Sequence, residues 1–124
     1  MKTFITVVFC MILAAGCYYD NEEYLFPETN TSCDTIQVTY SASVAPILQQ
    51  YCLSCHSNAK AGSFGGNIKL ETWANVKLRV ENGSLLGAIS HQGGYSPMPK
   101  GASKLNDCPI AVIQKWITAG SPDN

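Results

Sequence analysis

The 124-residue sequence lacks several features that would assign it to a class at once. It has no run of basic residues interleaved with aromatic ones, so nothing indicates a nucleic-acid-binding protein. It has no internal repeats and no low-complexity tracts. Its one nearly continuous apolar run, Phe4–Leu13, is too short to span a bilayer comfortably. The most informative features of the sequence are therefore its cysteines, its two histidines and their spacing.

The N-terminal stretch has the pattern of a targeting signal. Lys2 supplies a positive charge, the apolar run follows, and Ala14–Gly16 are small residues directly before Cys17. A cysteine at this place resembles a bacterial lipoprotein signal, which implies a signal peptide of residues 1–16 and a lipid on Cys17. An ordinary secretory signal cleaved nearby is the alternative. Either way, we expect the chain to leave the cytoplasm.

Residues 17–32 are predicted to be an acidic, flexible tether. They carry four acidic residues and no basic one, a composition that buries little apolar surface. Acidic residues behind a lipidated cysteine resemble surface-export signals of some Gram-negative lipoproteins, and a merely solvated linker is the alternative. The folded part is then 33–124, with seven Lys or Arg and five Asp or Glu, which is enough for one small domain.

The most informative stretch is Cys52-Leu53-Ser54-Cys55-His56. Two thiols three residues apart, followed at once by an imidazole, form the pattern of covalent c-type haem attachment. Each thiol adds across one haem vinyl group, and His56 then lies under the porphyrin and can ligate the iron. A thioredoxin-like redox pair would need a βαβ pattern, and a zinc site would need a second close pair of ligands; the sequence indicates neither. We therefore predict one covalent haem c, with His56 as the proximal ligand.

A long loop, 92–101, is the second candidate for the site, because loops of this size in small domains are usually functional. Met98 lies between Pro97 and Pro99, which stiffen the backbone on both sides. A thioether opposite a histidine is the ligation found in cytochromes c, so we predict Met98 as the distal iron ligand. A gap-filling methionine is the alternative. The rival ligand is His91, which we interpret as a surface or propionate-contacting residue.

The remaining cysteines suggest a cross-link. Cys10 leaves with the signal, and after lipid and haem attachment only Cys33 and Cys108 remain, one at each end of the domain. In an oxidising compartment we expect them to form a disulfide, with two unpaired thiols as the alternative.

The domain is predicted to be all-α. Ser43 is the expected cap of a first helix, Asp107 is the expected cap of the last, and Gly120 ends it. Trp73 and Trp116 are expected in the core and in haem packing. Apolar spacing predicts a loop at 58–67 and helices at 44–51, 71–81, 85–90 and from Asp107 onward.

Together these segments resemble a class I cytochrome c domain over about residues 40–120. The residues that carry the resemblance are the Val44–Leu48 run, the Cys52–His56 motif, the Ser96–Pro99 loop and the Ile113–Ile117 helix. The subtype resembles lipoprotein-anchored bacterial cytochromes. The resemblance implies a small all-α fold with three to five helices around one covalent haem, long loops and crossed terminal helices.

The function expected from this resemblance is one-electron transfer between redox partner proteins, not enzymatic catalysis. We expect a membrane-tethered monohaem carrier in the cell envelope of a Gram-negative bacterium, periplasmic or on the outer-membrane surface, as a monomer or a subunit of a redox complex. One alternative is a haem enzyme or a gas or peroxide sensor with a labile sixth ligand. The other is an accessory haem subunit of a larger surface complex.

Overall fold

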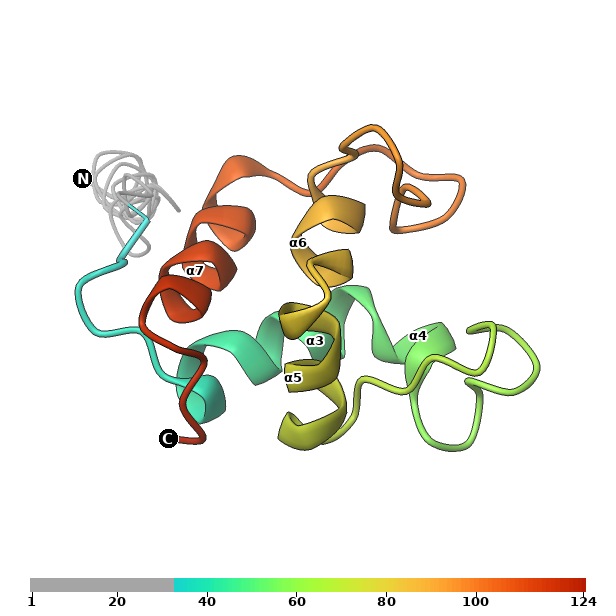
Figure 1. Cartoon of the computed structure of the whole chain (residues 1–124), viewed down its shortest axis with the longest axis horizontal. Coiled ribbons are helices and arrows are strands. Elements are labelled where there is room, and N and C mark those ends of the chain that lie inside the picture. Colours follow the sequence, from blue (N-terminus) through green and yellow to red (C-terminus); the bar gives the residue numbers. More distant parts are fainter. Residues whose placement is uncertain (1–32) are drawn as a thin grey trace, which may run out of the picture. The chain divides into compact units, whose positions relative to one another are not determined.

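The computed structural model describes residues 33–124, and the predicted signal peptide, Cys17 and the tether lie outside this part of the chain. Residues 33–124 form five α-helices and one π-helix and contain no strand, which confirms the predicted all-α class (Figure 1). In chain order the elements are η2 (Tyr40–Val44), α3 (Ala45–Tyr51), α4 (Leu53–His56), α5 (Trp73–Glu81), α6 (Ser84–Ile89) and α7 (Asp107–Thr118).

The first helix begins earlier than the sequence predicts. Thr39 is the N-cap of η2, and its hydroxyl accepts a hydrogen bond from the Ala42 N–H. Ser43, the predicted cap, lies inside the first turn, where its hydroxyl accepts a bond from the Thr39 N–H at 3.2 Å. The prediction was wrong because the two hydroxyls cap the turn reciprocally and extend it by four residues. Pro46 is the second residue of α3, which follows η2 directly.

The middle helices follow the predicted ranges closely. Thr72 caps α5, so the helix begins at Trp73, two residues later than the predicted Glu71. Gly83 has a φ of 74° between α5 and α6, a backbone conformation that a glycine adopts without steric cost. Residues 58–67 form turns, as predicted.

The last helix also differs at its cap. Asn106 is the N-cap of α7 and makes no side-chain capping bond, and Asp107 is the first helical residue. The exposed Asp107 carboxylate instead pairs with Lys104 at 3.0 Å. The predicted capping role of Asp107 was wrong because the helix begins one residue earlier than predicted, which places Asp107 in its first turn, where an acidic residue is still favourable. Gly120, with a φ of 92°, follows the end of α7 as predicted.

The core lies between the first and last helices and is centred on Trp116, which is fully buried. The Tyr40 ring of η2 lies 5.5 Å from the Trp116 ring, centroid to centroid, so the two ends of the domain are in contact. The Trp116 indole N–H donates to the Pro122 carbonyl, and the Trp73 indole N–H donates to the Ser121 carbonyl. Both tryptophans therefore hold the C-terminal segment against the core.

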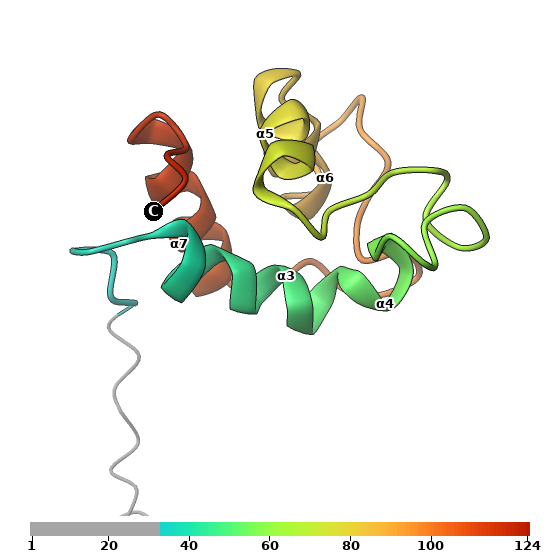
Figure 2. The ribbon, with the colours of Figure 1, turned by 90° about the horizontal axis from the view of Figure 1, so that it is seen from below.

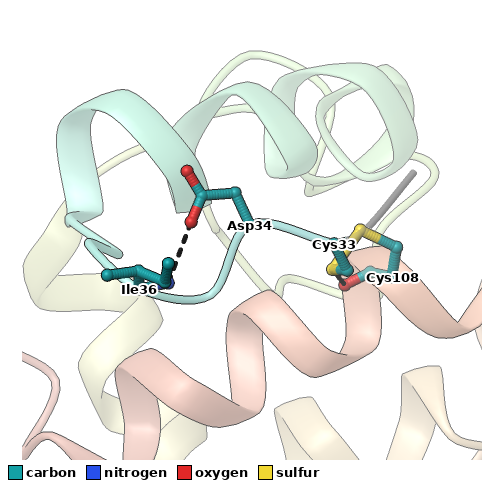
Figure 3. The surroundings of a disulfide bond; sticks show 4 residues. All are labelled: Cys33, Asp34, Ile36 and Cys108. Carbon is teal, nitrogen blue, oxygen red and sulfur yellow. Dashed lines mark hydrogen bonds between the residues drawn. A yellow bond between two sulfur atoms is a disulfide. The ribbon is translucent and has the colours of Figure 1, made fainter. Parts of the chain in front are cut away.

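The predicted disulfide is present. Cys33 and Cys108 are bonded, with their Cα atoms 5.2 Å apart, and they join the segment before η2 to the first turn of α7 (Figure 3). In the same segment the Asp34 carboxylate accepts a hydrogen bond from the Ile36 N–H (Figure 3). The covalent bond reinforces the contact between η2 and α7.

The arrangement separates the two ends of the described domain, 33–124, from α4. Figures 1 and 2 both show α4 and the loop after it at the end of the domain opposite the C-terminus. The cross-linked region near the termini and the Cys52–His56 motif therefore lie in different parts of the domain. Among the helices of residues 33–124, none has the length and apolar character needed to cross a membrane.

Candidate functional site

Two adjoining cavities lie beside α4 and bring the predicted site residues together. Their volumes are about 130 Å³ and about 380 Å³. The larger one falls within the range of about 300–1,000 Å³ that is usual for small-molecule sites. The walls that the two cavities share consist of Cys52, His56, Ile68, Ile89, Ser96 and Met98. The cavities therefore join the motif of α4 to the 92–101 loop.

The Cys52–His56 motif forms its own helical turn. Helix α3 ends at Tyr51, Cys52 has a φ of −120°, and α4 begins at Leu53. The His56 N–H bonds to the Cys52 carbonyl at 2.9 Å, which places the first thiol and the imidazole on successive levels of one turn. Cys52 and Cys55 are free thiols, and Cys55 borders the larger cavity only. Burial raises the pKa of the Cys52 thiol to about 11, so it is protonated at neutral pH.

The His56 imidazole is buried and oriented by the backbone. Its Nδ1 lies 2.9 Å from the Ile68 carbonyl oxygen, and since a carbonyl can only accept, Nδ1 carries the proton. In the neutral ring the other nitrogen, Nε2, carries the lone pair and is able to ligate a metal. A histidine that donates one ring N–H to a backbone carbonyl is the usual arrangement around a metal-ligating imidazole.

Gly65 makes this arrangement sterically possible. A Cβ at this position would lie 2.6 Å from the Cys55 carbonyl oxygen and 2.9 Å from the His56 Nδ1. The loop after α4 can therefore close over His56 only with glycine here. The Leu70 N–H bonds to the His56 carbonyl at 2.9 Å, and this bond brings the far end of the loop back to α4.

Met98 is held by the end of α6. Its N–H donates to the Ala88 carbonyl at 3.0 Å, and its carbonyl accepts a hydrogen bond from the His91 Nε2 at 3.1 Å. The loop before it is fixed by the Tyr95 ring, which lies so close to the Gly87 backbone that a Cβ there would overlap it. Besides the stiffened backbone expected from Pro97 and Pro99, the loop therefore makes two contacts with α6 and one with His91, just after this helix.

His91 does not line either cavity. Its ring is directed to the Met98 backbone, so it supports the loop that carries the predicted distal ligand. Trp116 lies in the buried core and Trp73 packs against it, as predicted. Neither tryptophan lines the cavities, so their predicted packing against a haem stays a prediction.

The charge of the site is positive. Arg79 lines the smaller cavity and Lys100 the larger one, and neither cavity has an Asp or Glu in its walls. Most other residues of the smaller cavity are apolar, among them Leu70, Leu85 and Ala88. An apolar group that carries negative charge at its periphery, such as a porphyrin with its propionates, is chemically matched to these walls.

Within residues 33–124, no three His, Cys, Asp or Glu side chains are grouped so that they could hold a metal ion by themselves. His56 and the Met98 thioether border the same cavities, but a thioether is a soft ligand and a weak acceptor. The chemistry of the donors therefore suits an iron already held in a porphyrin better than a structural zinc ion.

The motif residues were predictable from the sequence, whereas their supports were not. Ile68 acts through its backbone carbonyl, and Ala88 does the same, so neither side chain gives a signal. The glycines of loop 58–67 were visible, but which of them approaches His56 depends on how the loop closes.

The chain matches no protein-family model, no curated protein and no solved structure.

Proposed function

We propose that residues 33–124 form a small class I cytochrome c domain that carries single electrons between redox partners through one covalent haem c. The observation that carries this proposal is that Cys52, His56 and Met98 line the same two cavities, although Met98 lies on a separate loop. In this function, Cys52 and Cys55 would hold the haem as thioethers, His56 would be the proximal ligand and Met98 the distal ligand. A bound haem supplies a reversible one-electron change of its iron.

The state of the Cys52 thiol disfavours dithiol redox chemistry, the alternative to haem attachment. A reactive Cys-X-X-Cys pair needs a nucleophilic thiol with a lowered pKa, because the thiolate is the attacking species. The pKa of Cys52 is instead raised to about 11 by burial. Described residues 33–124 also contain no strand, and so lack the βαβ setting of thioredoxin-like proteins.

The contact between the first and last helices supports the class I cytochrome c fold. In that family the terminal helices cross, and here η2 contacts α7 through the Tyr40 and Trp116 rings. The haem motif follows directly after the first helix and the methionine loop precedes the last one, as in that family. The order of the elements and the position of the cavities are both consistent with this fold.

The way Met98 is held supports an electron carrier over an enzyme or sensor. Enzymes and gas or peroxide sensors need an iron position that is open or that opens readily, whereas a carrier keeps both axial positions filled. The Met98 backbone is bonded on both sides, to the Ala88 carbonyl and to His91. These bonds oppose departure of the loop. An accessory haem subunit of a larger complex would use the same site, and it differs only in its partners.

The test is to compare wild type with Met98→Ala and Met98→His. The oxidised wild type should show the weak near-infrared band of sulfur-to-iron charge transfer, and the reduced protein should bind carbon monoxide poorly. Met98→Ala should lose the band, bind carbon monoxide rapidly and have a lower reduction potential. Met98→His is the control, because it should lose the band and lower the potential but still exclude carbon monoxide. Rapid carbon monoxide binding by the wild type would favour the enzyme or sensor function.

We also propose that the domain is attached to a membrane of the cell envelope of a Gram-negative bacterium by a lipid on Cys17, periplasmic or at the outer-membrane surface. Only the sequence supports this anchor, because residues 14–17 lie outside the described part of the chain. There, the small residues Ala14–Gly16 directly precede Cys17. Cys17→Ser should release the protein into the soluble fraction, whereas Cys10→Ser, inside the predicted signal, should not. A Cys17→Ser protein that stays membrane-bound after a salt wash contradicts the lipid anchor.

A further inference from the structure

The end of α6 contains a histidine where a helix would normally favour glycine. His91 has a φ of 53°, and its N–H bonds to the Ala88 carbonyl while the Gln92 N–H bonds to the Gly87 carbonyl. These two bonds form a Schellman motif, whose left-handed position is usually occupied by glycine or asparagine. Non-glycine residues are uncommon in this conformation, and histidine is among those enriched in it, together with asparagine and aspartate. Ending the helix requires no imidazole, however, because glycine or asparagine would do the same.

The side chain of His91 makes a contact that glycine cannot make. Its Nε2 lies 3.1 Å from the Met98 carbonyl oxygen, and since that oxygen only accepts, Nε2 donates. The Ala88 carbonyl, part of the same helix end, accepts from the Met98 N–H at 3.0 Å. One helix terminus thus binds the Met98 backbone from both sides.

The rest of the loop before Met98 is exposed to solvent. Residues 92–97 are all exposed, and Met98 itself is half-buried. Tyr95 packs on Gly87, but Ser96 and Pro97 separate that contact from Met98. The hydrogen bonds at Met98 therefore constrain the thioether more directly than any contact of the preceding residues.

We propose that His91 is a positioning residue that keeps Met98 in place as the distal ligand. Without the bond from Nε2, the Met98 carbonyl is free to rotate away, and the thioether leaves the iron position more often. The inference rests on the proposed ligation by Met98 and adds the residue that determines how firmly the ligand is held. His91 itself contacts the Met98 backbone and lines neither cavity.

Three substitutions separate this role from a general effect on folding. His91→Gly keeps the left-handed backbone without steric cost and removes the donor. His91→Asn also tolerates this backbone, but its amide nitrogen extends only about as far as the imidazole Nδ1. His91→Gln places an amide nitrogen about as far out as Nε2 and so can restore the bond to the Met98 carbonyl. The measurements on the haem-loaded full chain are the near-infrared band, the carbon monoxide association rate of the reduced protein and the thermal unfolding midpoint.

The proposal predicts that His91→Gly and His91→Asn weaken ligation by Met98 without lowering the stability of the fold. His91→Gly and His91→Asn should bind carbon monoxide about fivefold faster, equivalent to about 1 kcal/mol at 1.4 kcal/mol per tenfold, with a weaker near-infrared band. Their unfolding midpoints should not fall, because both residues suit the left-handed position. His91→Gln should match the wild type in both ligation measurements.

Several results would overturn the proposal. If His91→Gly and His91→Asn both give the same ligation measurements as the wild type, the hydrogen bond does not hold Met98. The proposed function survives this result if Met98→Ala still changes the spectrum. Equal losses in all three variants, glutamine included, show that the imidazole is needed for another reason. A spectrum that changes with His91→Gly but not with Met98→Ala makes His91 the ligand and contradicts both proposals.

Discussion

Gly65 is the residue whose substitution should disturb the site most selectively. In Gly65→Ala, the new Cβ would meet the Cys55 carbonyl and the His56 ring, and the loop must move away from the imidazole. We expect a loss of about 1–3 kcal/mol in stability and reduced yield of haem-loaded protein. Gly62→Ala is the matched control, because its Cβ would meet only the Asn67 amide oxygen at 3.7 Å. Urea unfolding and the haem content of the two variants test this, and equal behaviour contradicts the proposed role of Gly65.

In protein made without haem, the alkylation rate of the Cys52 thiol and its contribution to stability should both depend on pH. Its pKa is raised by burial from 9.0 to about 11, so at pH 8 it should alkylate about 100-fold more slowly in the folded than in the urea-unfolded chain. Because the folded state keeps the proton longer, the thiol favours folding below pH 9, and this contribution is lost as the pH rises to about 11. Mass spectrometry of iodoacetamide-treated protein measures the ratio of the two rates. A ratio near one would show that the thiol is not buried.

Among single residues, the sequence predicts those site residues that have distinctive chemistry and spacing. Cys52, Cys55, His56 and Met98 were found because thiols, imidazoles and thioethers have few uses in such a pattern. The partner of His56, the Ile68 carbonyl, was not predictable because every residue has such a group. His91 was interpreted as a surface or propionate-contacting residue, and its bond to the Met98 carbonyl was not predictable, since only the folded chain shows which atom its ring meets.

Helix α6 is the platform for the 92–101 loop, which carries the predicted ligand Met98, and Gly87 is the critical position of this helix. An alanine in a helix interior normally stabilises it by about 1 kcal/mol relative to glycine. Here the Cβ of Gly87→Ala would overlap the Tyr95 ring, so we expect the loop to shift and carbon monoxide to bind faster. Gly93→Ala, where the Cβ meets nothing within 4 Å, is the control in the same region. Flash-photolysis rebinding rates of the reduced proteins distinguish the two, and similar rates contradict the platform role.

The existence of the helices was more predictable than their ends. Apolar spacing and the Asn82–Gly83 and Gly120 signals located α5, α6 and α7 within about two residues. The caps of η2 and α7 were missed because several polar residues near each start can cap a helix. For η2, the Tyr40 N–H bonds to the Asn124 side chain, a partner that no local pattern reveals.

For the whole domain, the bond between Cys33 and Cys108 is the principal covalent constraint. It closes a loop across a sequence separation of 75 residues, and removing it should cost about 2–4 kcal/mol. Cys33→Ser and the double variant Cys33→Ser with Cys108→Ser should lose about the same stability, because either removes the same cross-link. Neither cysteine lines the cavities, so the haem spectrum should not change. Denaturant unfolding at pH 7 measures the loss, and an unchanged midpoint in the double variant contradicts a stabilising disulfide.

The central claim for the whole molecule is one covalent haem on Cys52 and Cys55. The most direct measurement is the haem content of purified protein denatured in alkaline pyridine, together with extraction into acidic organic solvent. The account predicts a c-type pyridine spectrum, one haem per chain, and haem that stays with the polypeptide during extraction. Cys52→Ser with Cys55→Ser should leave no covalent haem, whereas the Cys33→Ser and Cys108→Ser pair should retain it. A wild-type protein whose haem extracts freely, or that carries none when made in a cell with haem-attachment machinery, contradicts the account.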